Sequence, residues 1–144
     1  MQKEALDYLN TQRVGVLAVE MLDGSPHAAT VHFAHSENPL IFYFQTSKLY
    51  RKSEALLGRE FSRASFVVGS DESNMKTLQL DGDVRILSLD DSGIDGVYFA
   101  RFPDKKEKAM SNPGALFITF TPKWWRFTDW TTPEGKKIWT SDSK

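Results

Sequence analysis

Two short apolar segments separated by a turn signal constrain the fold more than any other feature of the sequence. Residues 13–20 (RVGVLAVE) and 27–34 (HAATVHFA) are both rich in small and β-branched side chains, which favour strands. Between them, Asp23 and Gly24 form a dipeptide typical of the tight turn in a β-hairpin. The N-terminal part of the chain is therefore predicted to form antiparallel β-structure.

Five further segments have the length and apolar character of strands. Residues 40–46 follow a second turn, so the first three strands are expected to pair in sequence order as a meander. Gly82 lies within the alternating segment 77–87, which predicts a bulge or bend of the kind that lets a sheet curl. The remaining strands are expected at residues 64–69, 115–121 and 124–130.

Three other segments have helical character. Residues 3–12 carry apolar side chains at helical spacing, residues 49–57 end at a glycine stop signal, and residues 97–109 are expected to be helical on either side of Pro103. The final segment, residues 131–144, is mostly polar and is expected to form a tail.

The element count indicates a small barrel. The sequence has six or seven expected strands, two or three expected helices, and no repeat or linker, which predicts one domain over residues 1–144. A helix inserted after the third strand suits an antiparallel barrel, in which closure of the sheet removes exposed edges. The expected fold class is therefore mainly β, with helices flanking an antiparallel barrel.

The composition excludes several classes of function. Apolar residues make up 40% of the chain and charged residues 26%, a globular balance, and the formal net charge is −1. The absence of cysteine excludes disulfides, thiolate metal sites, iron–sulfur clusters and cysteine nucleophiles. The N-terminus does not resemble a signal peptide, and no apolar run approaches the length of a membrane helix. We therefore expect a cytoplasmic protein with no membrane partner.

Tryptophans near the C-terminus permit a second interpretation. Four of them could form a stacking platform for single-stranded nucleic acid, but such platforms normally lie in a basic groove, and few cations are near them. Core packing and a subunit interface account for them better, so no nucleic-acid partner is expected. The tryptophans are Trp124, Trp125, Trp130 and Trp139.

Residues 42–57 (FYFQTSKLYRKSEALL) contain the strongest candidate for a binding site. An apolar strand ends in the polar residues 45–47, and Arg51 and Lys52 follow in the first turns of the expected helix. Hydroxyls and free backbone N–H groups gather at a helix start, where the helix dipole is positive. Two cations beside them could form a phosphate pocket.

A simpler interpretation of the same residues remains open. Thr46 or Ser47 could serve only as the N-cap of the helix, followed by solvated basic side chains. Helix caps are more common than phosphate sites, so the residues alone favour this second interpretation.

No other cluster of side chains predicts a reaction. His27, His32 and His35 are close in sequence, but strand alternation places His32 on the opposite face from the other two, so no metal site is expected. The sequence has no nucleophile elbow, no P-loop and no paired carboxylates. Any catalysis would be carried by a bound cofactor, and no catalytic side chain is assigned.

In order along the chain, residues 4–130 resemble the pyridoxamine 5'-phosphate oxidase-like family of FMN-binding split barrels, in its short, general stress protein-like branch. The phosphate segment of that family has an aromatic strand, a Thr and a short polar run that ends in basic residues. Thr46, Ser47, Arg51 and Lys52 match this pattern. The opening hairpin, the segment TLQLDGDVRIL and the segment ALFITFTPKWWRFTDW resemble further strands of the family.

The resemblance implies a flavin site assembled from several strands. Thr30, Val31 and His32 would lie along the flavin ring, and Gln45 and Thr46 would meet the ring and the ribityl chain. The physical requirement is an apolar wall with a few backbone donors at the pyrimidine edge.

The remaining contacts implied by the resemblance are polar. Ser47, Arg51 and Lys52 would hold the phosphate, because a dianion favours fixed cations and hydroxyls. Thr77, five residues before the glycine of the later strand, would contact the flavin, with Gln79 on the same face.

The resemblance further implies a homodimer with two equivalent FMN sites at the subunit interface, and Trp125 would cover the cofactor of the partner. Full pyridoxamine phosphate oxidases carry an Arg where Ala29 stands here, and a C-terminal substrate segment that this chain lacks. The expected function is therefore an FMN-dependent oxidoreductase that acts on a small electron donor or acceptor, and vitamin synthesis is not expected. The alternatives are a non-catalytic flavin-binding stress protein, a haem- or deazaflavin-binding barrel, and FAD as the flavin.

Overall fold

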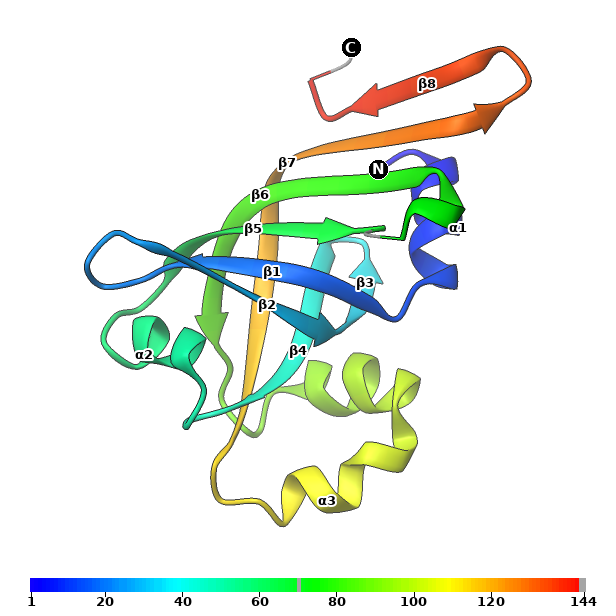
Figure 1. Ribbon diagram of the computed structural model, residues 1–144. Helices are drawn as coiled ribbons and strands as arrows, with labels where there is room; N and C mark the ends of the chain where they lie inside the picture. The colour runs from blue at the N-terminus through cyan, green and yellow to red at the C-terminus, as the bar shows by residue number, and fades with distance from the viewer. Residues whose placement is uncertain (70, 143–144) are drawn as a thin grey trace.

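A computed structural model describes residues 1–69 and 71–142, and at its centre lies one antiparallel sheet of eight strands. The sheet runs in the order β2-β1-β5-β6-β7-β4-β3 and curls into a half-barrel (Figure 1). The predicted antiparallel split barrel with flanking helices is confirmed. The strands are β1 (Val14–Glu20), β2 (Pro26–His32), β3 (Ala34–Glu37), β4 (Leu40–Ser47), β5 (Ser62–Val68), β6 (Lys76–Ile86), β7 (Ala115–Thr132) and β8 (Gly135–Thr140).

Helices flank the sheet at its ends. A second layer made of η2, η3 and α3 lies below β4 and the first half of β7, whereas α2 lies near the turn between β1 and β2 (Figure 1). Within residues 1–69 and 71–142, no helix is both long and apolar enough to cross a membrane. The helical segments are α1 (Lys3–Thr11), α2 (Arg51–Leu57), η1 (Glu72–Asn74), η2 (Ile94–Phe99), η3 (Pro103–Lys105) and α3 (Lys106–Met110).

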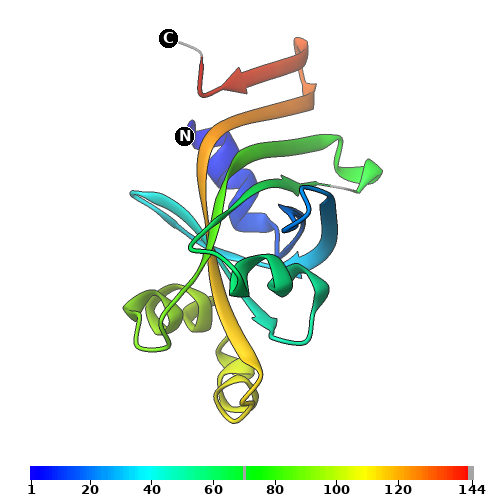
Figure 2. The same ribbon diagram turned by 90° about the vertical axis from the view of Figure 1, so that its left-hand side faces the viewer.

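Strand β7 joins the parts of the sheet. It pairs with β6 along one edge, and its other edge pairs first with β4 and then with β8. Figure 2 shows this strand running through most of the height of the molecule, between α3 and β8. Residues 115–121 and 124–130 were expected as two strands, and the structure joins them into one.

Aromatic side chains fill two cores, one on each side of β4 and β7. The first lies inside the barrel, where Phe33, Phe42 and Phe66 pack with ring centroids 5.2–5.7 Å apart. The second lies between the outer side of the barrel and the η2–α3 layer, and includes Tyr98 and Phe117. Because alternate residues of β4 face the two cores, this strand is covered on both sides.

The expected pairing of the first three strands is confirmed for the first two, which form a hairpin, and is wrong for the third. β1 pairs with β2 and β5, whereas β4 pairs with β3 and β7, so β2 and β4 do not form a ladder. The expected strand 27–34 is also two strands: β2 ends at His32 and β3 begins at Ala34, and Phe33 between them is buried in the barrel core with no exposed surface. The chain therefore crosses from one end of the sheet to the other at this residue.

The expected polar tail is wrong in part, because residues 135–140 form β8. Gly135 has a φ of +95°, which is compatible with the tight turn that returns the chain along β7. The ring of Trp139 then stacks on Phe127 with centroids 5.5 Å apart. Backbone pairing and one aromatic contact thus hold a mostly polar segment in the sheet. Residues 143–144 of the expected tail lie outside the described residues.

The bulge predicted at Gly82 is confirmed. The register between β6 and β7 shifts between Asp81 and Gly82, so that Lys123 is an extra residue on β7. A Cβ atom at position 82 would lie 2.1 Å from the carbonyl oxygen of Thr121. The two backbones therefore approach each other at a distance that only glycine permits.

The substitution Gly82→Ala is expected to lower the free energy of unfolding by about 3 kcal/mol, because the backbone of β7 must move to admit a methyl group. Urea denaturation measures this change. Gly96→Ala is the control, since a Cβ atom there would meet nothing within 4 Å. Similar stabilities for the two variants would contradict the requirement for glycine at the bulge.

Candidate functional site

The segment between β4 and α2 forms a tight turn. The N–H of Leu49 donates to Ser47 Oγ at 3.2 Å, and the N–H of Tyr50 donates to the Ser47 carbonyl at 3.1 Å. Helix α2 consequently begins at Arg51 with Tyr50 at its N-cap position, and no side chain caps it. The expectation that the helix begins at residue 49 with a hydroxyl cap is therefore wrong, because Ser47 closes the preceding turn instead.

Lys52 is a buried cation without an anionic partner. Its residue surface is only 5% exposed, and its Nζ lies 4.6 Å from the centroid of the Tyr50 ring. Among the residues that the structure describes, no carboxylate forms an ion pair with it. Burial lowers the pKa of this ammonium group below its ordinary value.

Thr46 supplies a second unmet polar group in the same segment. The residue is 5% exposed, and its Oγ1 is buried without a hydrogen-bond partner in the described part of the chain. A buried hydroxyl without a partner has a cost in folding free energy of about 1–3 kcal/mol. Thr46 and Lys52 therefore both retain unused capacity for binding an anion.

Arg51 differs from Lys52 because its side chain is exposed. Its charge contributes to a lowered pKa of Asp23, although the largest cause is the hydrogen bond from Ser25 to that carboxylate. Ser53 lies on the buried face of the helix and donates from Oγ to the Ser47 carbonyl at 2.6 Å. Of the two predicted phosphate cations, one is buried and one reaches solvent.

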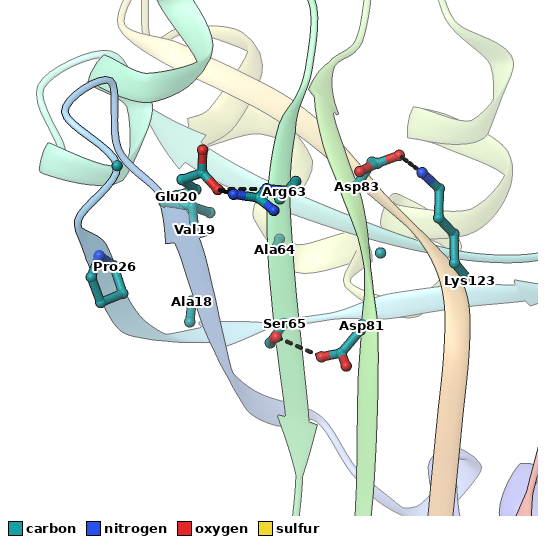
Figure 3. Close-up of a pocket in the computed structure, with 12 residues that line it drawn as sticks. Ala18, Val19, Glu20, Pro26, Arg63, Ala64, Ser65, Asp81, Asp83 and Lys123 are labelled. Atoms are coloured by element: carbon teal, nitrogen blue, oxygen red, sulfur yellow. Dashed lines mark hydrogen bonds and ion pairs between the residues drawn. The ribbon is translucent and has the colours of Figure 1, made fainter.

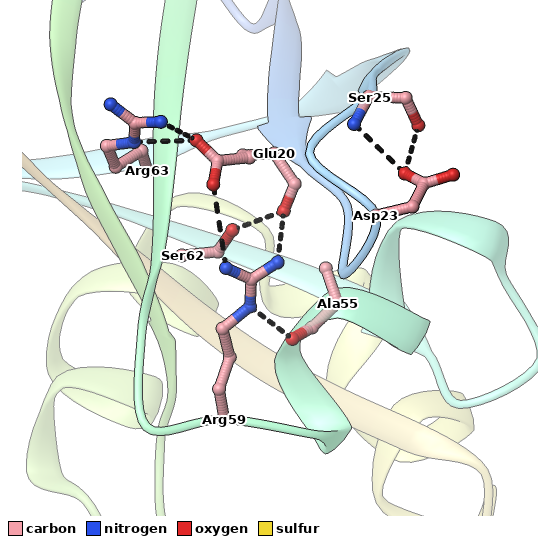
Figure 4. Close-up of polar contacts among 7 residues, drawn as sticks. All are labelled: Glu20, Asp23, Ser25, Ala55, Arg59, Ser62 and Arg63. Atoms are coloured by element: carbon pink, nitrogen blue, oxygen red, sulfur yellow. Dashed lines mark hydrogen bonds and ion pairs between the residues drawn. The ribbon is translucent and has the colours of Figure 1, made fainter.

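Polar contacts fix the C-terminal end of α2 against β1 (Figure 4). The Nε of Arg59 donates to the Ala55 carbonyl at 3.3 Å, and its Nη2 donates to the Glu20 carbonyl at 3.0 Å. Ser62 Oγ donates to the same Glu20 oxygen at 2.5 Å. These bonds hold the short helix, and Lys52 with it, in one place on the barrel.

Strand β2 places its predicted flavin contacts on two faces. Thr30 and His32 are exposed on the outer face, whereas Val31 faces the core and is 7% exposed. The backbone of Val31 bonds to β1, because the hydrogen-bonded pairs of this ladder fall on the odd-numbered residues, so Val31 offers a ligand neither its side chain nor its backbone groups. In the described chain β2 pairs only with β1, so the backbone groups of its other edge are free to bond a cofactor.

The other predicted contacts lie on three further strands, β6, β4 and β7. Gln79 shares the outer face with Thr30 but stands three strands away, at about 14 Å. Thr77 is half-buried on the same strand, and its Oγ1 donates to the Val68 carbonyl at 3.4 Å. Gln45 is half-buried on β4, and Trp125 packs in part against the barrel core. One copy of the chain thus brings together the residues around α2, but not all of the predicted site.

One residue of this region was not singled out from the sequence. Tyr50 lies between the turn and the helix, and its ring covers the Lys52 ammonium group. An aromatic residue two positions before a basic residue at a helix start is a weak signal, which explains why the sequence did not identify it.

A groove of about 620 Å³ on the outer face of β1, β5 and β6 has no unpaired cation in the described structure. Figure 3 shows the three polar contacts that satisfy its charged side chains. They join Glu20 to Arg63, Lys123 to Asp83 and Ser65 to Asp81, the last two at 2.6 Å. Within residues 1–69 and 71–142, no group of three or more His, Asp or Glu side chains is placed to hold a metal ion. The α2 region therefore remains the better candidate for an anion site.

Comparison with solved structures identifies the fold in other proteins. A pyridoxamine 5'-phosphate oxidase-related, FMN-binding protein from Nostoc punctiforme has a TM-score of 0.69 and 16% identity, over 96% of this chain and 88% of that chain. A general stress protein 26-related protein from Clostridium acetobutylicum has a TM-score of 0.63 and 15% identity, over 96% and 93% of the two chains. The haem storage protein HutZ from Vibrio cholerae has a TM-score of 0.71 and 15% identity, over 85% and 89%.

At these identities the similarity establishes the fold alone. Among curated protein sequences, no relative of the chain is found. The profile of the pyridoxamine 5'-phosphate oxidase family, however, matches residues 1–129. Because this match includes the barrel, α2 and the η2–α3 layer, the chain belongs to the pyridoxamine 5'-phosphate oxidase family.

Proposed function

We propose that this protein binds FMN and uses it to transfer electrons between small molecules. The observation that carries the proposal is the largely buried side chain of Lys52, whose ammonium group has no counter-ion among the described residues. A charge that is removed from water needs a partner, and a phosphate is an anion of the right size and charge. Membership of the family supports FMN as the molecule that carries this phosphate.

The residues around α2 fit a phosphate group. Lys52 would supply a buried charge, Arg51 a solvent-facing fork, and Thr46 a hydroxyl with no other partner. Ser47 Oγ already accepts from the Leu49 N–H, and its O–H proton is available to a phosphate oxygen. These four side chains can all donate hydrogen bonds to a phosphate, and none of them is acidic.

We place the flavin ring along the free edge of β2. The hairpin end of this strand is near α2, since Glu20 pairs with Pro26 and is bonded to Arg59. His32 is at the opposite end, about 20 Å along the strand. A phosphate at α2 would therefore direct the ring toward Thr30 and His32. When bound, FMN supplies the hydride and electron chemistry, and the protein binds and orients it.

We also propose that the active form is a homodimer. Thr77 and Gln79 are on the outer face of β6, away from α2, so one copy does not gather all the predicted contacts. In a dimer, the second copy would supply these residues and Trp125 to the flavin held by the first. A single polypeptide would then contribute to two equivalent sites.

An absorption spectrum separates this function from its alternatives. After incubation with FMN and desalting, a flavin spectrum that NADH or NADPH bleaches is the expected result. A retained flavin that no donor reduces would indicate a non-catalytic flavin-binding protein. A Soret band after incubation with haemin, without retention of flavin, would contradict the proposal and favour haem.

The double variant Arg51→Ala, Lys52→Ala is expected to weaken FMN binding by about 2–5 kcal/mol, because a buried anion loses its cations. Quenching of flavin fluorescence measures the affinity. Lys48→Ala is the matched control, since Lys48 is an exposed lysine in the same turn. Equal affinities of the double variant and the control would contradict the phosphate assignment.

Thr46→Val is expected to change stability and binding in opposite directions. Removal of a buried, unbonded hydroxyl should raise the free energy of unfolding of the flavin-free protein by about 1 kcal/mol. The same change should weaken FMN binding by about 1–2 kcal/mol, since the hydroxyl no longer bonds the cofactor. Urea denaturation and flavin titration measure the two effects, with Thr46→Ser as the control that keeps the hydroxyl. Loss of both stability and affinity would indicate a packing defect.

The lowered pKa of Lys52 predicts a pH dependence of the flavin-free protein. Between that lowered pKa and the ordinary value of 10.5, the unfolded chain binds a proton that the folded chain does not. The contribution of Lys52 to the free energy of unfolding should therefore rise with pH in this window. Denaturation curves of the wild type and Lys52→Met should show the rise only where the lysine is present. Parallel pH profiles would contradict the burial of a charged group.

A further inference from the structure

A second group of cations converges on one aromatic ring at the far end of β2. The guanidinium carbon of Arg13 lies 5.0 Å from the centroid of the Phe102 ring, and the Nζ of Lys105 lies 4.6 Å from it. The ring of His32 meets Phe102 edge-on at 5.8 Å. Phe102 itself has no exposed surface, so these side chains cover it.

The backbone fixes this cation cluster (Arg13, His32 and Lys105) from three elements. The carbonyl of Arg13 accepts from the Phe33 N–H at 3.0 Å, which joins the start of β1 to the end of β2. Lys105 is the last residue of η3, and its backbone N–H donates to the Phe102 carbonyl at 3.1 Å. The cluster is therefore assembled by the fold, because its members are far apart in sequence.

Arg13 and Lys105 repel each other, and together with burial they disfavour the protonated form of His32. Burial, then Lys105, then Arg13 lower the pKa of His32. Burial is also the main cause of the lowered pKa of Lys105, which Arg13 lowers further and Asp104 partly restores. In residues 1–69 and 71–142, neither Arg13 nor Lys105 forms an ion pair.

Cation–π contact explains why a cation lies beside the Phe102 ring, but not why two cations and a histidine gather around the same ring. Each such contact is weakly stabilising at an exposed site. Like charges held side by side oppose that gain, and the nearby Asp104 offsets their repulsion only in part, since it forms no ion pair with Arg13 or Lys105 in the described residues. An anion between them would remove the repulsion and accept hydrogen bonds from all three groups.

We propose that the cation cluster binds the anionic group, a carboxylate or a phosphate, of the molecule that exchanges electrons with the flavin. This inference rests on the proposed function, which directs the flavin ring toward His32. The cluster lies about 20 Å along β2 from the hairpin end near α2, so it is separate from the cofactor phosphate. The reaction partner is therefore a small organic anion, held at its charged end beside the ring.

Sulfate is the probe for the cluster, because its charge stays constant over the titration of histidine. Proton–carbon NMR of the full chain follows the Cε1–H signals of His27 and His32, with His32→Gln used for assignment. Sodium sulfate is compared with sodium chloride at equal ionic strength, with and without FMN. Sulfate is expected to raise the pKa of His32, while the Cε1–H signal of His27, at the other end of β2, serves as the internal reference.

Variants separate the cluster from general charge effects. In Arg13→Gln, Lys105→Gln, sulfate affinity should fall at least about tenfold. Lys137→Gln is the matched control, since that lysine also lies over an aromatic ring, 4.8 Å from the centroid of Trp139. Equal responses of His27 and His32, or equal sulfate affinity in the two variants, would overturn the anion site. The single variant Lys105→Gln, at a half-exposed position, repeats the test should the double variant not fold.

A separate readout tests the position of the cluster beside the flavin. In the FMN-loaded protein, sulfate is expected to shift the visible absorption of the flavin, and the double variant should not show this shift. A response of His32 to sulfate without a change in the flavin spectrum would overturn the link to the reaction partner. Failure of FMN to bind would contradict the proposed function, and the flavin-free titration would still decide whether the anion site exists.

Discussion

The backbone hydrogen bonds of β7 are the constraint on which the rest of the structure depends. This strand pairs with β6 on one edge, and with β4 and β8 on the other, so it connects both halves of the sheet. Its 18 residues are too long for an untwisted barrel strand, and the extra residue at Lys123 allows it to bend. The close approach to Gly82 keeps the hydrogen bonds on both sides of the bend, because almost every buried backbone group must be paired.

The same sheet sets the position of charge in the molecule. Aromatic cores cover both faces of β4. After a short turn at the end of this strand, α2 begins at Arg51 and packs one face against the barrel. Lys52 is the second residue of that helix and is buried by this geometry, while Arg51 beside it stays exposed. The framework thus holds a cationic side chain in a largely buried place, at a cost that a bound anion would offset.

The sequence predicted most elements, because period-two alternation and turn residues are local signals. The Asp23 and Gly24 hairpin and the bulge at Gly82 were both identified in this way. Pairing between strands was less predictable. The chain passes from β2 to β3 at Phe33, and the side chain of this residue is buried only once the core has assembled. β8 was missed because its side chains are polar and its stability comes from backbone pairing and the stacking of Trp139.

The candidate site likewise has a part that the sequence predicts and a part that only tertiary packing creates. Arg51 and Lys52 could be named from the sequence, since basic residues at a helix start form a local motif. The burial of Lys52, the unbonded hydroxyl of Thr46 and the convergence of Arg13 and Lys105 on Phe102 are products of tertiary packing. No local pattern encodes contacts between segments so far apart in the chain.

The free edge of β2 has a consequence for the behaviour of the chain in concentrated solution. An unpaired strand edge can recruit a strand from another molecule, which is a route to aggregation. β2 opposes this at both ends: Pro26 removes a backbone donor at its start, and positive charge surrounds its last residue. Two molecules that approached through this edge in parallel register would bring these like charges together. The charges that we assign to recognition of an anion therefore also oppose association of two molecules through the edge of β2.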